Sequence, residues 1–457
     1  MRENILWLLV DAHRARRRSS IALAQQRARL ADMVTHARSA SPFYRELYQG
    51  LPERVQSVEQ LPITDKKMLM GRFDDWITDR EVTLEKIRAF VADPDRVGER
   101  FLGRYTVAAT SGTTGRPGFF LTDDRTMAVV SAMALRTLTA WLGFGDFVRL
   151  LRGGGRVAFS VAPGHTATGV PAARVQRSAK GRKRILPMLV HMPVVELVPR
   201  LNAFHPAILA AYASTAKFLA NERKAGRLDI RPVLVVSYAE ELSVDDYDEI
   251  AEVFGAKVGN TYAATECPFL SYSCEHKWLH VNADWAILEP VDADYRPVPP
   301  GGHSHTVLLT NFANRLQPIL RYDLGDSVIQ RRDPCPCGNP LPAIRVEGRS
   351  AEVLSFSGAN GERVSIPPLA FEIDHIPGVA LSQIEQTAPT RLRVRFVPEA
   401  GADPVAVWEM AHTALKRLLA KHELDHVVLE RAEEAPEQTV GGKFRQVIPL
   451  RSGERAD

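Results

Sequence analysis

The segment from Thr110 to Pro117 has the residue types that most clearly suggest chemistry, and it reads Thr110-Ser111-Gly112-Thr113-Thr114-Gly115-Arg116-Pro117. It follows residues 104–109, which are expected to form a strand. Glycines let backbone N–H groups approach anionic oxygens closely, and hydroxyls add further donors. The segment lacks the Gly-Lys-Ser/Thr ending of a Walker loop. It predicts a cradle for the β- and γ-phosphates of ATP, made by Ser111, Gly112, Thr113, Thr114 and Gly115. The alternative is a plain hairpin turn.

The four cysteines suggest a second kind of site, a structural zinc centre. Three thiolates and an imidazole make a tetrahedral site, and the candidates are Cys274, His280, Cys335 and Cys337. Two alternatives remain at this stage: Cys267, which directly follows Glu266, competes as a ligand, and His276 could replace His280. A third is four free, mostly buried thiols.

The bulk composition limits the class of protein. The 457 residues are enough for two to four domains, and 45% hydrophobic with 25% charged residues is ordinary for a globular protein. A net charge of +4 suits a site for phosphates and does not argue for nucleic acid. The apolar run Ile5 to Val10 precedes its arginines and is shorter than a signal or a membrane span. We therefore expect a cytoplasmic protein without a nucleic-acid or membrane partner.

The pattern of apolar residues predicts an α/β fold. Residues 1 to about 100 are expected to be mostly helical. From there to about 330, strands such as Val233–Val236 alternate with helices such as Ser214–Lys224 and Asp245–Val253. After about 350 two strands precede a helix over 405–420 with one apolar face. The prediction is a large multi-subdomain N-terminal α/β domain (1–348) and a small α+β C-terminal domain (349–457).

A basic run over 177–184 reads RSAKGRKR. Charge runs usually form solvated surface, so a surface loop is expected. The alternative is a landing site for the phosphates of CoA or for an acidic carrier protein.

Four segments follow the phosphate loop in a fixed order, and the five together resemble the motifs of the adenylate-forming superfamily. They are Asn260-Thr261-Tyr262-Ala263-Ala264-Thr265-Glu266, Arg321-Tyr322-Asp323-Leu324-Gly325-Asp326, Gly348-Arg349-Ser350 and Gly441-Gly442-Lys443-Phe444-Arg445. Other segments resemble the phenylacetate–CoA ligase branch: Ser41 to Leu47, Leu61-Pro62-Ile63-Thr64-Asp65-Lys66, His205-Pro206, Tyr212-Ala213-Ser214 and Cys335-Pro336-Cys337-Gly338.

The resemblance implies a nucleotide site. Asp326 would accept hydrogen bonds from the ribose hydroxyls, and Arg349 would reach the ribose or a phosphate. Tyr262 would pack on the adenine, beside the backbone of Ala239 and Glu240. Ala239 stands where the family often has glycine. The other expected nucleotide contacts are Asn260 and Thr261.

The resemblance also implies the catalytic groups. Glu266, next to Thr265, would bind Mg²⁺ through a hard carboxylate oxygen. Lys443 would stabilise the charge that develops when a carboxylate attacks the α-phosphate of ATP. The small domain is mobile in this family, so Lys443 would serve the first step and then leave. The pivot would lie near 350–352, where Ala351 departs from the usual acidic residues.

The acid and the acceptor are less well determined. His165, in a Gly-rich turn, and the small residues Ala263 and Ala264 are expected to border the acid, which the resemblance suggests is aromatic. The expected acceptor is CoA, which would give acyl-CoA, AMP and pyrophosphate. A carrier-protein thiol or an amine is the alternative acceptor, and a non-catalytic nucleotide-binding relative is the alternative of another class. A homodimer is left open.

Overall fold

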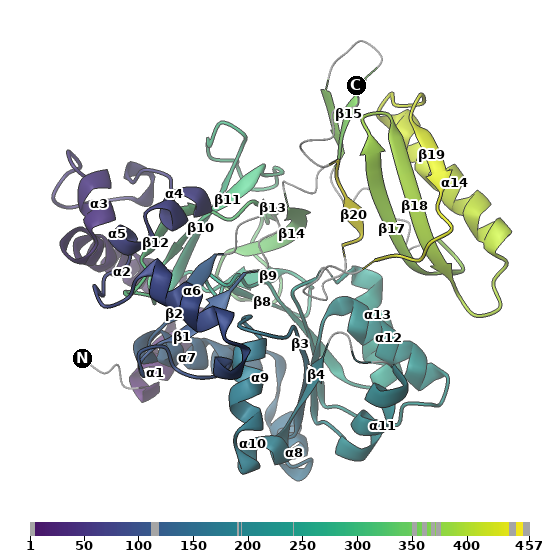
Figure 1. Ribbon diagram of the computed structural model, residues 1–457, viewed down its shortest axis with the longest axis horizontal. Helices are drawn as coiled ribbons and strands as arrows, with labels where there is room; N and C mark the ends of the chain where they lie inside the picture. The colour runs from purple at the N-terminus through teal and green to yellow at the C-terminus, as the bar shows by residue number, and fades with distance from the viewer. Residues whose placement is uncertain are drawn as a thin grey trace.

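The computed structural model describes residues 5–110, 118–189, 192, 194–240, 242–349, 354–358, 363–366, 371, 376–437 and 445–450. Within them the chain forms a large N-terminal α/β domain and a smaller C-terminal domain (Figure 1). This confirms the predicted fold class. No single helix in these ranges is long and apolar enough to cross a membrane.

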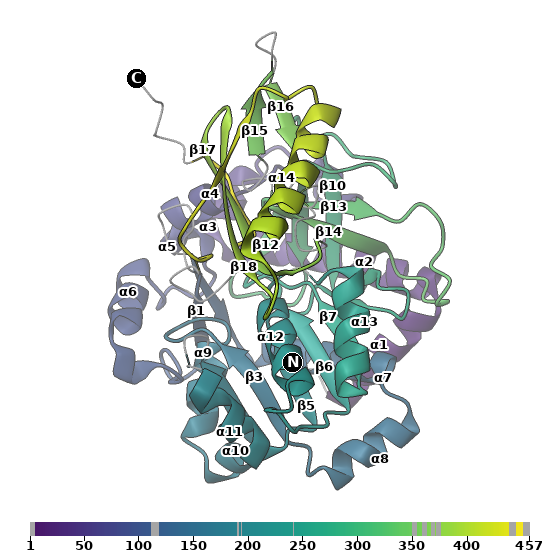
Figure 2. The ribbon, with the colours of Figure 1, turned by 90° about the vertical axis from the view of Figure 1, so that its right-hand side faces the viewer.

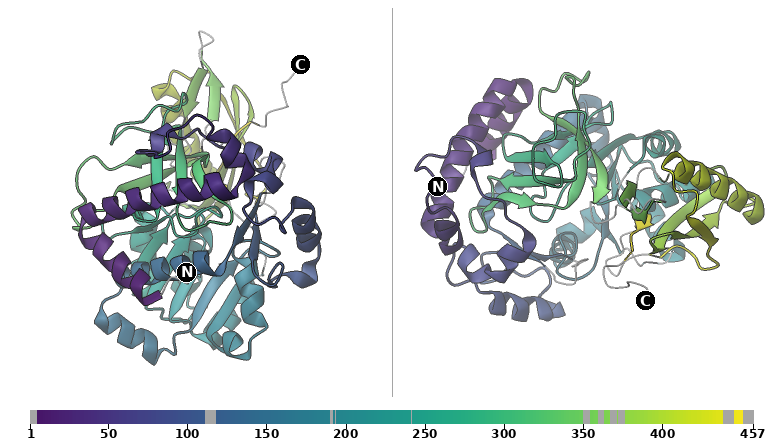
Figure 3. Two further views of the ribbon diagram at one scale, coloured as in Figure 1. Left: turned by 90° about the vertical axis from the view of Figure 1, so that its left-hand side faces the viewer. Right: turned by 90° about the horizontal axis from the view of Figure 1, so that it is seen from above.

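The N-terminal region is helical, as predicted. Its helices are α1 (Ile5–Arg17), α2 (Ser19–Ala40), α3 (Pro42–Leu47), α4 (Lys66–Gly71), α5 (Phe73–Trp76) and α6 (Leu84–Ala92). Ser41 ends α2 and begins α3, because its hydroxyl accepts from the Tyr44 N–H and Pro42 takes the first helical position. Figure 3 shows α1 and α2 along the side of the large domain that faces away from the small domain. Their apolar faces join the core cluster that contains Trp76 and Trp285.

A five-stranded parallel sheet forms the centre of the large domain. Its order is β4-β3-β5-β6-β7, with β3 (Val157–Val161), β4 (Ile185–Leu189), β5 (Ile208–Ala211), β6 (Leu234–Tyr238) and β7 (Lys257–Thr261). The helices between and around these strands are α7 (Asp124–Trp141), α8 (Phe144–Arg152), α9 (Gly169–Gln176), α10 (Ala179–Arg184), α11 (Val194–Phe204), α12 (Ala213–Lys224) and α13 (Val244–Phe254). Because all five strands run the same way, their carboxyl ends share one edge, where ligands bind in open α/β sheets.

Antiparallel strands complete the large domain. A hairpin pairs β1 (Thr106–Ala109) with β2 (Phe119–Thr122). One sheet has the order β10-β11-β12 and another the order β13-β14-β9-β8. Their bounds are β8 (Ser271–Ser273), β9 (Leu279–Val281), β10 (Ala286–Val291), β11 (Thr306–Asn311), β12 (Ile319–Asp323), β13 (Asp326–Gln330) and β14 (Ala343–Arg349).

The small domain has its own core. The hairpin of β15 (Leu354–Ser357) and β16 (Arg363–Ile366) precedes a sheet of order β19-β18-β17-β20. Its strands are β17 (Val379–Ala388), β18 (Arg391–Pro398), β19 (Val428–Arg431) and β20 (Val447–Ile448), covered by α14 (Pro404–Lys421). The apolar cluster from Leu354 to Val447 shares no member with the clusters before β14 ends. The boundary predicted at 348 falls at the end of β14.

The basic run over 177–184 is not a simple loop, because residues 179–184 form α10. Ser178 caps the helix by accepting from the Gly181 N–H, and the cationic side chains are exposed. The helix leads directly into β4, so it lies at the amino edge of the parallel sheet. The five residues of β4 separate it by about 16 Å from the carboxyl edge. This placement does not bring the run to the candidate active site.

Candidate active site

The carboxyl ends of β6 and β7 bring two predicted motifs side by side. Tyr238 pairs with Thr261 in register. The next residue, Ala239, has a φ of +64°, the left-handed conformation that favours glycine. The Glu240 carboxylate accepts from the Ser214 N–H at 2.8 Å and so caps α12. The backbone at Ala239 and Glu240 is therefore fixed beside the residues that follow β7.

A tight turn presents Thr265 and Glu266. The Cys267 N–H donates to the Ala264 carbonyl at 2.9 Å, which leaves Thr265 and Glu266 at the two central positions. Cys267 is fully buried and anchors the turn. The Asn311 amide donates to the Glu266 carbonyl at 2.8 Å. The backbone of the motif is held from two sides, while the side chains of Thr265 and Glu266 stay partly exposed.

Tyr262 and Asp326 meet across the site. The Tyr262 hydroxyl donates to Asp326 Oδ2 at 2.6 Å. Asp326 begins β13 and stands opposite Arg349 in the antiparallel pair with β14. The side chain of Arg349 lies outside the described atoms. Tyr262, Asp326 and the backbone of Arg349 thus lie at one place in the fold. Asn260, also predicted here, donates its backbone N–H to Ser273 Oγ at 2.8 Å.

Lys66 belongs to the site, although the sequence suggested no role for it. Thr64 forms a parallel bridge to Tyr322: its N–H donates to the Arg321 carbonyl at 2.9 Å, and its carbonyl accepts from the Asp323 N–H at 2.8 Å. This places Lys66, at the start of α4, so that its ammonium donates to Thr110 Oγ1 at 3.0 Å.

The charges around Glu266 act in opposite directions. Burial raises the pKa of Glu266 above its ordinary value. The Tyr322 hydroxyl, which donates to Glu266 Oε1 at 3.0 Å, and the positive charge of Lys66 lower this pKa, while Asp326 raises it. A cation beside Glu266 would lower the pKa of its carboxyl group and so oppose the effect of burial on that pKa. The half-buried carboxylate next to a second acidic residue therefore suits a hard divalent cation such as Mg²⁺.

The predicted phosphate loop lies mostly outside the described residues, but its two ends are fixed. Thr110 and Gly118 close the β1–β2 hairpin: the Thr110 N–H donates to the Gly118 carbonyl, and the Gly118 N–H donates to Thr110 Oγ1, both at 2.9 Å. Residues 111–117 therefore begin and end beside the Lys66 ammonium. The predicted phosphate ligands Ser111, Gly112, Thr113, Thr114 and Gly115 are all in that undescribed segment.

His165 is close to the site through its backbone. Its carbonyl accepts from the Ala109 N–H at 2.6 Å. Its ring is buried, and the centroids of the His165 and Phe90 rings are 5.2 Å apart. The His165 Nε2 atom lies 3.4 Å from the Asp93 carbonyl. Burial lowers the pKa of His165. The ring thus contacts the segment around α6, whereas Ala263 is exposed beside the Thr265–Glu266 turn.

The segment that carries Lys443 (438–444) also lies outside the described residues, and a buried amide holds both of its ends. Gln383 on β17 donates through Nε2 to the Glu437 carbonyl at 2.9 Å and to the Arg445 carbonyl at 2.8 Å. Its Oε1 accepts from the Glu437 N–H at 3.1 Å. The two residues that flank the segment with the expected catalytic lysine, Glu437 and Arg445, are therefore held by one side chain of the small domain.

The predicted zinc ligands converge. The ligand atoms of Cys274, His280, Cys335 and Cys337 all lie within 4.8 Å of one another. The sulfurs of Cys274 and Cys335 are 3.6 Å apart, too far for a disulfide. Two sulfurs on a tetrahedral zinc with ~2.3 Å bonds are separated by about 3.8 Å, close to this distance.

The orientation of His280 supports the same assignment. Its Nδ1 lies 2.9 Å from the Leu341 carbonyl, which leaves Nε2 facing Cys337 Sγ at 3.2 Å. A backbone partner of this kind fixes the tautomer of metal-binding histidines. Burial raises the pKa of Cys337 to about 12, so thiolates in this cluster need a cation beside them. Among the described residues, the alternatives Cys267 and His276 are not in the cluster.

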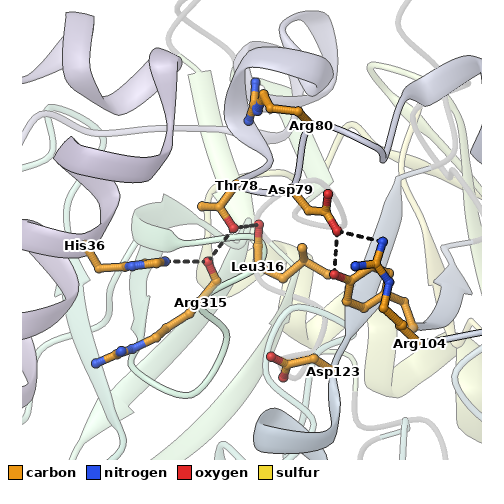
Figure 4. Close-up of a pocket in the computed structure, with 9 residues that line it drawn as sticks. His36, Thr78, Asp79, Arg80, Arg104, Asp123, Arg315 and Leu316 are labelled. Carbon is orange, nitrogen blue, oxygen red and sulfur yellow. Dashed lines mark hydrogen bonds and ion pairs between the residues drawn. The ribbon is translucent and has the colours of Figure 1, made fainter. Parts of the chain in front are cut away.

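A separate pocket of about 420 Å³ lies at the other end of the β1–β2 hairpin (Figure 4). Its polar groups contact one another: Asp79 accepts from Tyr105 at 2.6 Å and pairs with Arg104 at 3.2 Å. The Thr78 hydroxyl lies 3.1 Å from the Arg315 carbonyl. The pocket does not include any predicted site residue, so it does not contribute to the candidate site.

Comparison with known proteins supports the fold. No protein-family model matches the sequence. The curated relative CapK of Staphylococcus aureus is 24% identical over 168 residues, which is 36% of this chain and 34% of CapK. The chain therefore aligns with only about a third of that relative. A 2-hydroxyisobutyryl-CoA ligase in the postadenylation state with 2-HIB-AMP has a TM-score of 0.67 at 21% identity, covering 95% of this chain and 90% of the ligase.

The chain has the fold of the adenylate-forming CoA ligases. ATP-bound MatB of Rhodopseudomonas palustris also matches, with a TM-score of 0.50 at 16% identity over 73% of this chain and 65% of MatB. The TM-score to the 2-hydroxyisobutyryl-CoA ligase falls from 0.67 to 0.55 when that ligase is in its thioesterification state. The overlap is therefore larger with the postadenylation structure of that ligase than with its thioesterification structure.

Proposed function

We propose that this protein activates a carboxylic acid with ATP, forming acyl-AMP and pyrophosphate, and transfers the acyl group to CoA. The observation that carries the proposal is the convergence of Lys66, Glu266 with Tyr322, and Tyr262 with Asp326 around the ends of the predicted phosphate loop. The ribose, a divalent cation and the phosphates of one nucleotide need these groups at neighbouring positions.

Each side chain has a role in this proposal. Asp326 accepts from the ribose hydroxyls, and Glu266 holds Mg²⁺, which neutralises phosphate charge when it is bound. Lys66 contacts the phosphates at the ends of the 111–117 segment. Lys443 is delivered to the nucleotide by the small domain. Thr265, in the same turn as Glu266, contacts the nucleotide.

We infer that the acid lies near the carboxyl ends of β5 and β6 and is aromatic, as in the phenylacetate–CoA ligase branch. Tyr212 follows β5 and Tyr238 ends β6, and their rings meet edge to face with centroids 5.3 Å apart. In this proposal the substrate ring packs near these two side chains, in the edge-to-face or offset geometry that aromatic rings prefer. His165 would contribute its backbone, and Ala263 and Ala264 would leave space for the ring.

A panel of acids tests the function. Purified protein should exchange labelled pyrophosphate into ATP only when the correct acid is present. The product should then be identified by mass after addition of CoA, of a carrier-protein thiol or of an amine. We expect an aromatic acid and CoA. Absence of exchange with a broad panel would contradict the enzymatic proposal, and exchange without an acyl-CoA product would contradict CoA as acceptor.

We further propose that Cys274, His280, Cys335 and Cys337 hold one structural Zn²⁺. The ion would join the β8–β9 hairpin, which follows the Glu266 turn, to the segment before β14. It would stabilise the folded chain and take no part in the chemistry. Metal analysis should find about one zinc per chain, and less than about a tenth of an equivalent would exclude the site.

A further inference from the structure

Helix α8 exposes apolar side chains to an unusual degree. Phe144 is 87% exposed and Leu151 is 79% exposed, the two highest values for large apolar side chains among the described residues. With Val148 they occupy positions i, i+4 and i+7, which fall on one face of a helix. The neighbouring face is the one that packs inward, because Leu150 is buried in a cluster with Leu142 and Leu234. On α8, the face with Leu150 is therefore covered by the protein, whereas the face with Phe144 and Leu151 is not.

The position of α8 makes this exposure consistent with a docking element. The helix follows α7 after a bend of 110°. In Figures 1 and 2 it lies at the end of the molecule opposite β15 and the small domain. It precedes β3, and so it lies at the amino edge of the parallel sheet, away from the candidate active site. An object bound to α8 would leave the carboxyl edge of the sheet accessible.

Cations surround this apolar face. Arg149 and Arg152 are exposed on α8 itself. Arg231 lines a surface pocket together with Arg149. The exposed cations of α10 lie at the same amino edge of the sheet, but at its β4 end, whereas α8 lies near β6 and β7. The acidic residue of α8, Asp146, is neutralised by Lys257 at 2.8 Å. The edge therefore combines exposed apolar side chains with a positive surface.

We propose that α8 docks this edge of the protein on an anionic lipid bilayer, in contrast to the absence of a membrane partner expected from the sequence. Phe144 and Leu151 enter the headgroup layer, and Arg149 and Arg152 contact lipid phosphates. Short amphipathic helices with large apolar residues on one face and arginines on the other bind membranes in this way. Two such copies facing each other would bring Arg149 and Arg152 against their own symmetry mates, since a twofold interface pairs a patch with itself. The charge thus favours an anionic surface over a second copy. The proposal does not depend on the enzymatic function.

Co-sedimentation of the full chain with lipid vesicles tests the proposal. We expect binding to vesicles that contain phosphatidylglycerol, weaker binding at high ionic strength because of screening, and little binding to pure phosphatidylcholine. The double variant F144S/L151S should bind anionic vesicles at least about tenfold more weakly, because two large apolar side chains are then missing from the part of the protein that enters the bilayer. R149S/R152S should lose the preference for anionic over neutral vesicles.

A matched control uses exposed apolar residues elsewhere. Val405 and Met410 on α14 are 60% and 41% exposed, so V405S/M410S removes apolar surface from the small domain and should bind vesicles like the unchanged protein. Circular dichroism and thermal melting confirm that each variant is folded. Absence of binding to anionic vesicles, or equal binding by F144S/L151S, would overturn the proposal. Self-association that is lost in F144S/L151S, without vesicle binding, would assign the face to a second copy and also overturn it.

Discussion

The large domain holds its part of the candidate site by contacts between side chains from distant segments, whereas the small domain holds the described ends of the segment that carries Lys443 against one strand, β17. In the large domain Lys66 contacts Thr110, and Tyr262 contacts Asp326. In the small domain the segment that carries Lys443 is tied at both ends by Gln383. Under the proposed function, this difference means that the nucleotide site is assembled from distant segments of the large domain, whereas Lys443 is supplied by a segment anchored separately in the small domain. Mutations in the two halves should therefore affect different steps.

The largest expected effect is that of Lys443→Ala. Adenylation, measured by acid-dependent pyrophosphate exchange, should fall at least about 100-fold, the scale of a transition-state charge contact. Thioester formation from supplied acyl-AMP should change little, because the large domain still binds the adenylate. Lys421→Ala, at the exposed end of α14, is the control and should leave both steps unchanged. Equal damage to both steps in Lys443→Ala would argue against a lysine that serves only one of them.

Lys66→Met should reduce adenylation about tenfold to 100-fold, through weaker binding of the phosphates. Because Lys66 lowers the pKa of Glu266, its removal should raise that pKa further. Mg²⁺ binds the ionised carboxylate, so the acid limb of the pH–rate profile should move to higher pH, and more Mg²⁺ should be needed below it. The control Lys67→Met changes the adjacent, exposed lysine. An unshifted acid limb would remove Lys66 from the neighbourhood of the metal.

The sequence predicted those parts of the site that lie within short motifs. Thr265 with Glu266, and Tyr262 with Asp326, were singled out because their motifs resemble those of the adenylate-forming superfamily, and the four zinc candidates because of their residue types. The structure brings each of these sets together. Lys66 could not be assigned a role in this way, because its position depends on contacts of Thr64 with a strand 256 residues further along the chain.

The direction of the His165 side chain and the helical conformation of the exposed basic run also could not be predicted from the sequence. The His165 ring turns towards Phe90, which a Gly-rich turn alone does not determine. The run over 177–184 was expected as a loop because its charges suggested only solvent exposure, yet Ser178 caps a helical turn there. The fold class was predictable because strands and helices alternate between 157 and 261, where the parallel sheet forms. The alternation expected to continue to about 330 does not, since residues 271–330 form antiparallel strands without an intervening helix.

Gln383→Leu tests whether anchoring Glu437 and Arg445, which flank the segment with Lys443, matters for activity. Two carbonyls would lose their donor, so the free energy of unfolding should fall by about 1–3 kcal/mol. Adenylation should also fall, by about tenfold, while thioester formation from acyl-AMP should change less. Gln386→Leu is a close control, because Gln386 is a buried amide of the same strand that donates to the Ser355 carbonyl at 2.8 Å instead. If both variants lose stability and neither changes the ratio of the two steps, Gln383 is purely structural.

The smallest expected effect is in the rigid half of the site, at Ala239. Its φ of +64° costs a residue with a Cβ about 1–2 kcal/mol, whereas glycine adopts it freely but loses about 0.5–1 kcal/mol of chain entropy on folding. Ala239→Gly should therefore raise the free energy of unfolding by up to about 1 kcal/mol, measured by urea denaturation. Ala225→Gly is the control: Ala225 ends α12 with a φ of −75°, so glycine relieves no strain there and should not stabilise the chain. If Ala239→Gly stabilises the protein and leaves pyrophosphate exchange unchanged, the strained backbone beside β6 is tolerated without being needed. If Ala239→Gly stabilises the protein but weakens ATP binding, a rigid backbone at residue 239 is needed to border the nucleotide. Residue 239 would then belong to the part of the site that is already formed before ATP binds.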